Sequence, residues 1–192
     1  MKNIVRLFLI LIAASSLTSC GYNSMVEKRE AVGSAWGNVE SAYQRRLDLI
    51  DNLVKTVKGA ADFEKTTLTQ VVEARAKATS VQIDANNLTE ENLEKFSAAQ
   101  DELKGSLSRL LVSVEAYPNL KATDAFRDLQ TQLEGTENRI NTARNSYNET
   151  VKDYNSYIAK IPQNIYSGWF GFAPKAYFKA ATGAEKAPEV KF

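Results

Sequence analysis

Residues 32–57 read VGSAWGNVESAYQRRLDLIDNLVKTV, and this stretch decides the fold. Its apolar residues recur in steps of 4, 3, 4, 7, 3 and 4, which is the spacing of one packed helix face and not the alternation of a strand. Neither proline nor a turn cluster interrupts the chain from Tyr22 to about Ala60, so we predict one long helix there. The face consists of Val32, Trp36, Val39, Tyr43, Ile50, Leu53 and Val57.

A second and a third helix are predicted in the next sixty residues. A weaker apolar stripe indicates a helix over residues 62–82, and DANNLTEEN reads as the connection that follows it. Thr89 is well placed to cap a third helix that runs to about Tyr117, because its hydroxyl can accept from an amide of the first turn. Apolar residues of this third helix alternate in steps of three and four, with Gln100 as the polar member.

A fourth, long helix is predicted after a break. Pro118 disfavours helical geometry at the residue before it. Thr123 or Asp124 then caps a helix that runs to about Lys160, and Pro162 ends it. No window alternates for long enough to predict a strand. We therefore predict an all-α fold, an elongated antiparallel four-helix bundle of two long and two shorter helices, with an irregular aromatic-rich C-terminal tail. The first and last helices should outrun the middle two by about 15 Å and leave a less covered apolar seam.

Three polar residues fall on these apolar faces. Arg46 occupies the position missing from the step of seven, and Gln100 and Glu137 lie on the third and fourth helices. A buried Arg–Glu pair fixes the register of helices more than it adds stability. A ligand-binding role for the three residues is the alternative.

The tail from Pro162 to Phe192 differs in composition from the helices. Seven of its 31 residues are aromatic, and SGWFGFAP is unsuited to a long helix. One hypothesis is that these aromatic residues pack over one end of the bundle. The other is that they dock on a partner or at a membrane interface, where tryptophan and tyrosine are favoured.

The N-terminus is typical of an export signal. A basic start precedes the apolar run LFLILIAA at residues 7–14, and SSLTS leads to Cys20, the single cysteine. LTSC at residues 17–20 resembles the bacterial lipobox, in which cleavage before the cysteine is followed by lipid attachment. We therefore predict a lipoprotein-type signal peptide at residues 1–19, lipidation of Cys20, a helical bundle at 20–161 and the tail at 162–192. An incidental cysteine beside an ordinary cleavage site and an uncleaved short anchor are the alternatives.

Composition excludes several kinds of chemistry. Apolar residues make up 44% and charged residues 24%, as in folded proteins, and a net charge of +1 gives no argument for binding nucleic acid. The chain has no histidine, which removes the usual general base and a common metal ligand. No nucleotide-binding glycine pattern is present either. We predict no catalytic residues, no metal and no cofactor.

Several motifs in order resemble one family. Residues 45–64, RRLDLIDNLVKTVKGAADFE, resemble the signature of the LemA family. YPNLKA, FRDLQTQLEGTENRI, ARNSYNETVKDYNSYI and GWFGF then follow in the order of that family. Asp51 stands where the family often has proline, and Phe63 where histidine is usual. The resemblance implies a helical, bacterial, membrane-associated protein without a well-defined activity, and a relative is associated with magnetosome membrane formation.

The sequence supports three functional hypotheses. The first is a non-enzymatic scaffold or adaptor, exported and anchored in the cell envelope through lipid on Cys20 as a periplasmic or outer-membrane lipoprotein. Its partners would be the membrane, an unidentified envelope protein and further copies of itself, and not nucleic acid. The second is a protein that oligomerises on the bilayer and remodels it. The third is an envelope enzyme that uses carboxylates, which would need a deep pocket with two converging carboxylates.

Overall fold

The computed structural model describes residues 2–59 and 64–179, with side chains from residue 21 onward. Helix predominates and the described part contains no strand, so the all-α prediction is confirmed. The four predicted helices are α1, α2, α3 and α5, and short helices lie in the connections. The elements in order are α1 (Lys2–Lys58), α2 (Lys65–Ser80), the 3-10 helix η1 (Ala85–Asn87), α3 (Glu90–Val114), α4 (Pro118–Lys121), α5 (Asp124–Ile158), α6 (Gln163–Tyr166) and the 3-10 helix η2 (Gly168–Phe170).

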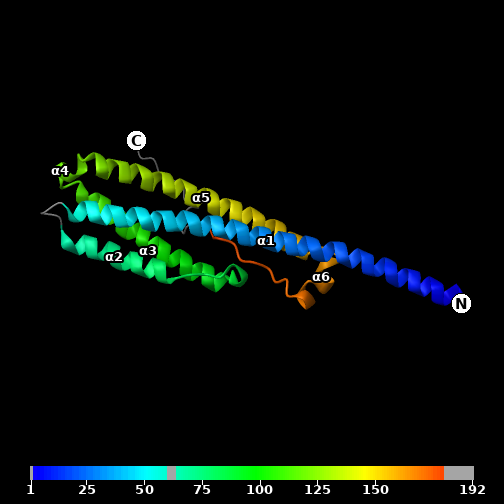
Figure 1. Cartoon of the computed structure of the whole chain (residues 1–192). Helices are drawn as coiled ribbons and strands as arrows, with labels where there is room; N and C mark the ends of the chain where they lie inside the picture. Colours follow the sequence, from blue (N-terminus) through cyan, green and yellow to red (C-terminus); the bar gives the residue numbers. More distant parts are fainter. Residues whose placement is uncertain (1, 60–63, 180–192) are drawn as a thin grey trace, which may run out of the picture.

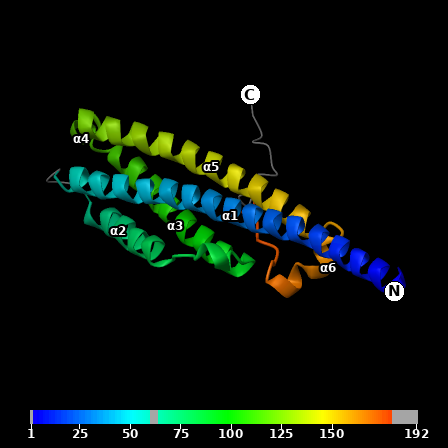
Figure 2. The same ribbon diagram turned by 45° about the vertical axis from the view of Figure 1, so that its right-hand side comes forward.

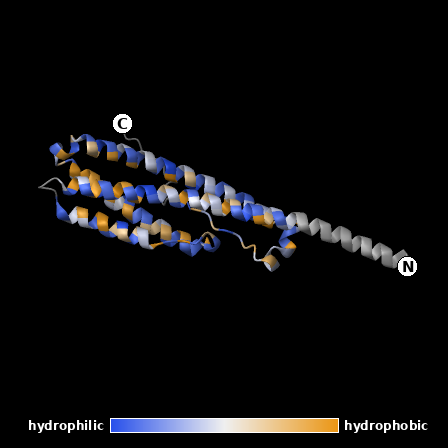
Figure 3. Cartoon of the chain, in the orientation of Figure 1, coloured by the Kyte–Doolittle hydropathy of each residue, from blue (hydrophilic) through white to orange (hydrophobic). Residues whose placement is uncertain are grey.

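The helices form an elongated bundle. Figures 1 and 2 show α1 and α5 side by side over the length of α5, with α2 and α3 as a second, shorter pair alongside them. Hydrophobic and hydrophilic residues alternate along these helices in Figure 3, as expected of helices that bury one face. The N-terminus lies at one end of the bundle, and α4 and the C-terminal end of α1 lie at the opposite end (Figure 1).

The predicted helix caps are present. The Thr89 hydroxyl accepts a hydrogen bond from the amide of Asn92 at 3.3 Å, and the Thr123 hydroxyl accepts one from the amide of Phe126 at 3.4 Å. Each satisfies an amide that has no acceptor inside its own helix. Of the two candidate caps for α5, the structure selects Thr123. Pro118 occupies the first position of α4, where a missing amide hydrogen costs nothing.

The core has two parts along the bundle axis. One part joins α1, α2, α3 and the start of α5 near α4, and includes Leu53, Val71 and Leu110, each 0% exposed. The other lies toward the N-terminal end and contains large aromatic residues, among them Trp36 and Tyr147. Side chains of this size dominate the free energy of burial, so the second part stabilises the long α1–α5 pair beyond the reach of α2.

The structure corrects the prediction of a less covered seam on the α1–α5 extension. Phe172 and Phe178 of the tail are buried there against α1 and α5, and Tyr166 of α6 is buried in the same cluster. The backbone amide of Ala176 also donates to the carbonyl of Leu88 at 3.1 Å. An apolar helix face left in water is costly, and the returning tail removes that cost.

Candidate functional site

Arg46, Gln100 and Glu137 meet inside the bundle. Arg46 Nη1 donates to Glu137 Oε1 at 2.8 Å, and Nη2 donates to both the backbone carbonyl and the side-chain oxygen of Gln100. The Arg46 side chain is 3% exposed and Glu137 is 30% exposed. The three residues come from α1, α3 and α5, so this polar cluster ties three helices at one level of the bundle.

Tyr43 and Lys104 complete the surroundings of the Arg46–Glu137 pair. Its guanidinium carbon lies 5.0 Å from the centre of the Tyr43 ring, and Lys104 makes a second ion pair with Glu137 at 3.4 Å. Arg46 Nε is buried and has no hydrogen-bond partner among the described residues. The cluster therefore satisfies most, but not all, of the polar groups it buries. Such a cluster specifies which helix faces meet.

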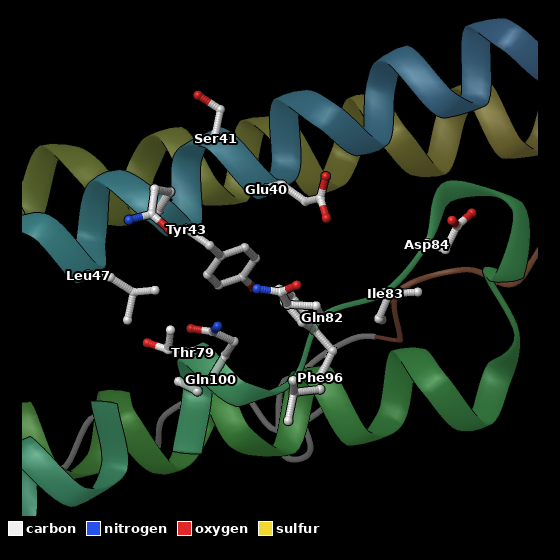
Figure 4. Close-up of a pocket in the computed structure, with 13 residues that line it drawn as sticks. Glu40, Ser41, Tyr43, Leu47, Thr79, Gln82, Ile83, Asp84, Phe96 and Gln100 are labelled. Atoms are coloured by element: carbon white, nitrogen blue, oxygen red, sulfur yellow. The ribbon is translucent and has the colours of Figure 1, made fainter. Parts of the chain in front are cut away.

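An open pocket lies next to the polar cluster. Its volume is about 480 Å³, and it lies between α1, the end of α2 and α3. Figure 4 shows Tyr43 and Gln100 in its wall, with the carboxylates of Glu40 and Asp84 at its rim. Its lining, as far as the structure describes the chain, includes no basic residue. Burial raises the pKa of the Tyr43 hydroxyl, so this phenol stays protonated and offers no base for catalysis.

The tail is fastened to α5 by paired asparagine bonds. Asn155 Nδ2 donates to the carbonyl of Lys175 at 2.8 Å, and its Oδ1 accepts from the amide of the same residue at 2.9 Å. Asn148 makes the same two bonds to Phe178, at 3.0 and 2.9 Å. Each side-chain amide thus satisfies both backbone groups of one extended residue, as a neighbouring strand would.

Two tyrosines complete this attachment. Tyr147 donates its hydroxyl hydrogen to the carbonyl of Ala176, and Tyr154 donates to the carbonyl of Ala173, both at 3.0 Å. Burial raises the pKa of both hydroxyls, which keeps them protonated as donors. At the far end of the segment Lys179 forms ion pairs with Glu90 and Glu94 of α3.

The attachment also has a signal in the sequence, which apolar spacing alone does not reveal. Tyr-Asn occurs at residues 147–148 and again at 154–155, seven residues apart on one face of a helix. The spacing of the two tyrosines predicts that they are core residues, and both are buried. The asparagines beside them are polar and do not belong to the apolar face. An amide next to a core position is nevertheless placed to bond a chain lying along that face.

We expect the double substitution Asn148→Ala and Asn155→Ala to release the tail. Removing two hydrogen bonds at each site should weaken docking by about 2–4 kcal/mol, because a typical bond contributes about 1 kcal/mol. Hydrogen exchange at the amides of Lys175 and Phe178 measures this directly. The matched control is Asn141→Ala with Asn145→Ala, two exposed asparagines of the same helix, which should leave exchange unchanged. Equal protection in both variants would contradict the role of the asparagines.

The N-terminal end of the packed body lies beside the predicted lipidation residue. The side chain of Cys20 itself is outside the described part, so its lipidation stays a prediction. At Gly21, α1 approaches α6 closely: a Cβ added there would collide with the hydroxyl of Tyr166. The absence of a side chain at this position lets α6 lie against α1 one residue after Cys20.

Of the two residues that depart from the LemA pattern, Asp51 and Phe63, Asp51 has a structural role. Asp51 of α1 forms an ion pair with Arg75 of α2 at 2.6 Å, and Arg75 Nε also donates to the carbonyl of Leu47. The acid thus joins the first two helices. Phe63, the other departure, lies outside the described residues.

Neither a metal centre nor a membrane span is found among residues 21–59 and 64–179, whose side chains the structure describes. These residues bring together no group of three or more histidine, cysteine, aspartate or glutamate side chains able to bind a metal ion. None of their helices combines the length and the apolar content required to cross a bilayer.

Comparison with known proteins decides the family. The model of the LemA family matches residues 35–192, which include the polar cluster and the tail. The chain belongs to the LemA family. The resemblance seen in its motifs is therefore confirmed.

Relatives of this LemA-family chain include named proteins of three bacteria. Magnetosome protein MamQ 2 of Paramagnetospirillum magneticum is 27% identical over 177 residues, which cover 82% of this chain and 64% of the relative. Protein LemA of Metamycoplasma hominis is 23% identical over 77% of this chain and 60% of its own length. Magnetosome protein MamQ of Magnetospirillum gryphiswaldense is 25% identical over 88% of this chain and 69% of its own length. This chain thus spans less than two thirds of the first of these relatives.

Proposed function

We propose that this LemA-family protein is a non-enzymatic scaffold or adaptor of the cell envelope, tethered to a membrane by lipid on Cys20. Membership of the family and the likeness to MamQ proteins support a membrane-associated envelope protein. The main support for the tether is the position of Cys20 relative to the packed body. The apolar run at residues 7–14 and Cys20 come just before Gly21, where α1 lies close to Tyr166 of α6.

The shape suits a tethered scaffold. From Gly21 to Lys58, α1 extends for about 55 Å at 1.5 Å per residue. The anchor would hold one end of this length, and α4 would project away from the bilayer (Figure 1). The polar cluster and the asparagine-fastened tail stiffen the rod, so it can present partners at a fixed distance from the membrane.

The interior supports a structural and not a catalytic role. Buried polar side chains bond to other parts of the protein, as Arg46 does with Gln100 and Glu137. A carboxylate-dependent enzyme would need two carboxylates that converge in a deep pocket. This pocket is open, and its two acidic residues, Glu40 and Asp84, stand at its rim.

The tether is tested with Cys20→Ala in the native host. We expect the variant to move from the membrane fraction to the soluble fraction with an unchanged helical circular dichroism spectrum, because the substitution lies outside the packed core. Several acyl chains anchor a protein stably, at about 0.8 kcal/mol for each buried methylene. A variant that lacks them should therefore lose its membrane attachment almost completely. Intact mass of the wild-type protein should show residues 20–192 with acyl-glycerol additions. An unmodified full-length mass, or a variant that stays in the membrane, would overturn tethering through Cys20.

A further inference from the structure

Exposed apolar side chains gather at the anchored end of the bundle. Among the described residues, eight large hydrophobic side chains are exposed, and five of them belong to this end. We call these five the end patch: Tyr22 (40% exposed), Ile161 (79%), Ile165 (61%), Trp169 (83%) and Phe170 (55%). Isolated exposed hydrophobic residues are ordinary, but a group of this size at one place marks an interaction surface.

Aromatic contacts of Tyr22 and Phe170 hold the end patch against α1. The ring of Tyr22 lies 5.3 Å from that of Phe170 and 5.6 Å from that of Phe172, both in edge-to-face contact. Tyr166 and Phe172 are buried beneath the segment and fasten it to the core. Trp169 is therefore presented to the outside by a packed turn, and core burial does not account for its exposure.

The location of the end patch indicates that a membrane surface is the partner it meets. The contact between Gly21 and Tyr166 places α6 level with the residue after Cys20, and Figures 1 and 2 show α6 beside the stretch of α1 that leads to the N-terminus. A lipid attached at Cys20 would bring the bilayer surface to this same level. A membrane anchored there thus meets the end patch before any other part of the body.

The chemistry of the segment matches the interface of a bilayer. Tryptophan, tyrosine and phenylalanine are favoured at the level of the lipid headgroups. Residues 160–175 include no acidic residue and two lysines, Lys160 and Lys175. Anionic headgroups therefore meet no repulsion from this segment.

We propose that the end patch inserts into the headgroup region of the membrane that carries the anchor, as a second attachment that fixes the tilt of the bundle. This rests on the proposed tethering. The patch needs little affinity of its own, because an anchor one residue from Gly21 keeps it at a high effective concentration near the bilayer. One flexible tether would let the bundle swing freely, and two attachments of one rigid body restrict it.

Tryptophan fluorescence tests the insertion. The chain has two tryptophans, the buried Trp36 and the exposed Trp169. We would place the lipidated Trp36→Phe variant in vesicles of phosphatidylcholine and phosphatidylglycerol that contain lipid brominated near the headgroup. Emission of Trp169 should shift to shorter wavelength and fall roughly twofold or more, because the ring enters the headgroup layer.

A matched reporter at the other end of the protein provides the control. Val112 is 72% exposed and lies near the end of α3 next to α4. The variant Trp36→Phe, Trp169→Phe, Val112→Trp should show no quenching by the same vesicles. If Trp36→Phe fails to fold, fluorine resonances of the fluorotryptophan-labelled wild-type chain distinguish the exposed from the buried tryptophan in the same vesicles.

The outcomes separate the two proposals. If intact mass shows the lipid on Cys20 and the protein sediments with vesicles, but Trp169 is quenched no more than the Val112→Trp reporter, the end-patch proposal is wrong and the tether stands. If the mass shows no lipid but Trp169 is quenched, the tether is wrong and the patch binds by itself. If neither lipid nor quenching is found, both are wrong.

Discussion

Trp36→Ala should lower the free energy of unfolding by about 4 kcal/mol, the largest effect we expect of a single substitution. Trp36 is 1% exposed, and its ring contacts those of Phe96, Tyr147 and Phe178 at centroid distances of 5.4, 5.8 and 6.0 Å. Its indole nitrogen also donates to the carbonyl of Ile83 at 3.3 Å. The substitution therefore opens a cavity between α1, α3, α5 and the tail.

Urea unfolding followed by circular dichroism measures this loss. Trp36→Phe should cost less, because the phenyl ring keeps part of the aromatic contact and loses only the hydrogen bond and some volume. Trp169→Ala is the matched control, since that tryptophan is 83% exposed and its removal should change stability by less than about 0.5 kcal/mol. Similar losses for Trp36→Ala and Trp169→Ala would contradict the assignment of Trp36 to the core.

Glu137→Ala should lower the free energy of unfolding by about 3 kcal/mol. The substitution leaves the Arg46 charge buried at 3% exposure with only Gln100 and the Tyr43 ring as partners. Removing one partner of a buried ion pair costs about 3–5 kcal/mol, and the 30% exposure of Glu137 places this pair at the low end.

A double variant tests whether the loss of stability in Glu137→Ala comes from the unpaired buried charge of Arg46. Arg46→Met with Glu137→Met removes both charges and should recover most of the stability lost in Glu137→Ala, because apolar side chains can replace a buried pair. The control Glu134→Ala removes an exposed acid one turn earlier on α5 and should have little effect. A loss in Glu134→Ala equal to that in Glu137→Ala would show that the surface charge of α5, and not the pair, is responsible. Membrane localisation of the stable double variant then tests whether the cluster has any role besides structure.

The N-terminal signal, the polar cluster and the tail differ in how far the sequence predicts them. The lipobox-like LTSC at residues 17–20 is a local motif, so its prediction needs no fold. Arg46 and Glu137 are recognisable because each interrupts an apolar face, but they are 91 residues apart, and their bond depends on how α1 and α5 pack. The Tyr-Asn pairs at residues 147–148 and 154–155 repeat at helical spacing, but which segment the asparagines bond is seen only in the structure.

Local residue spacing specifies the four helices, the cap at Thr89, the two candidate caps Thr123 and Asp124, and which faces are buried, because these features depend on residues within a few turns of each other. The path of the tail, the bond between Arg46 and Glu137, and the gathering of Trp169, Phe170 and Tyr22 at the N-terminal end of the bundle come instead from tertiary packing. They depend on contacts between residues far apart in the chain, and their free energy comes from the shape of the surfaces that meet, which no local pattern specifies.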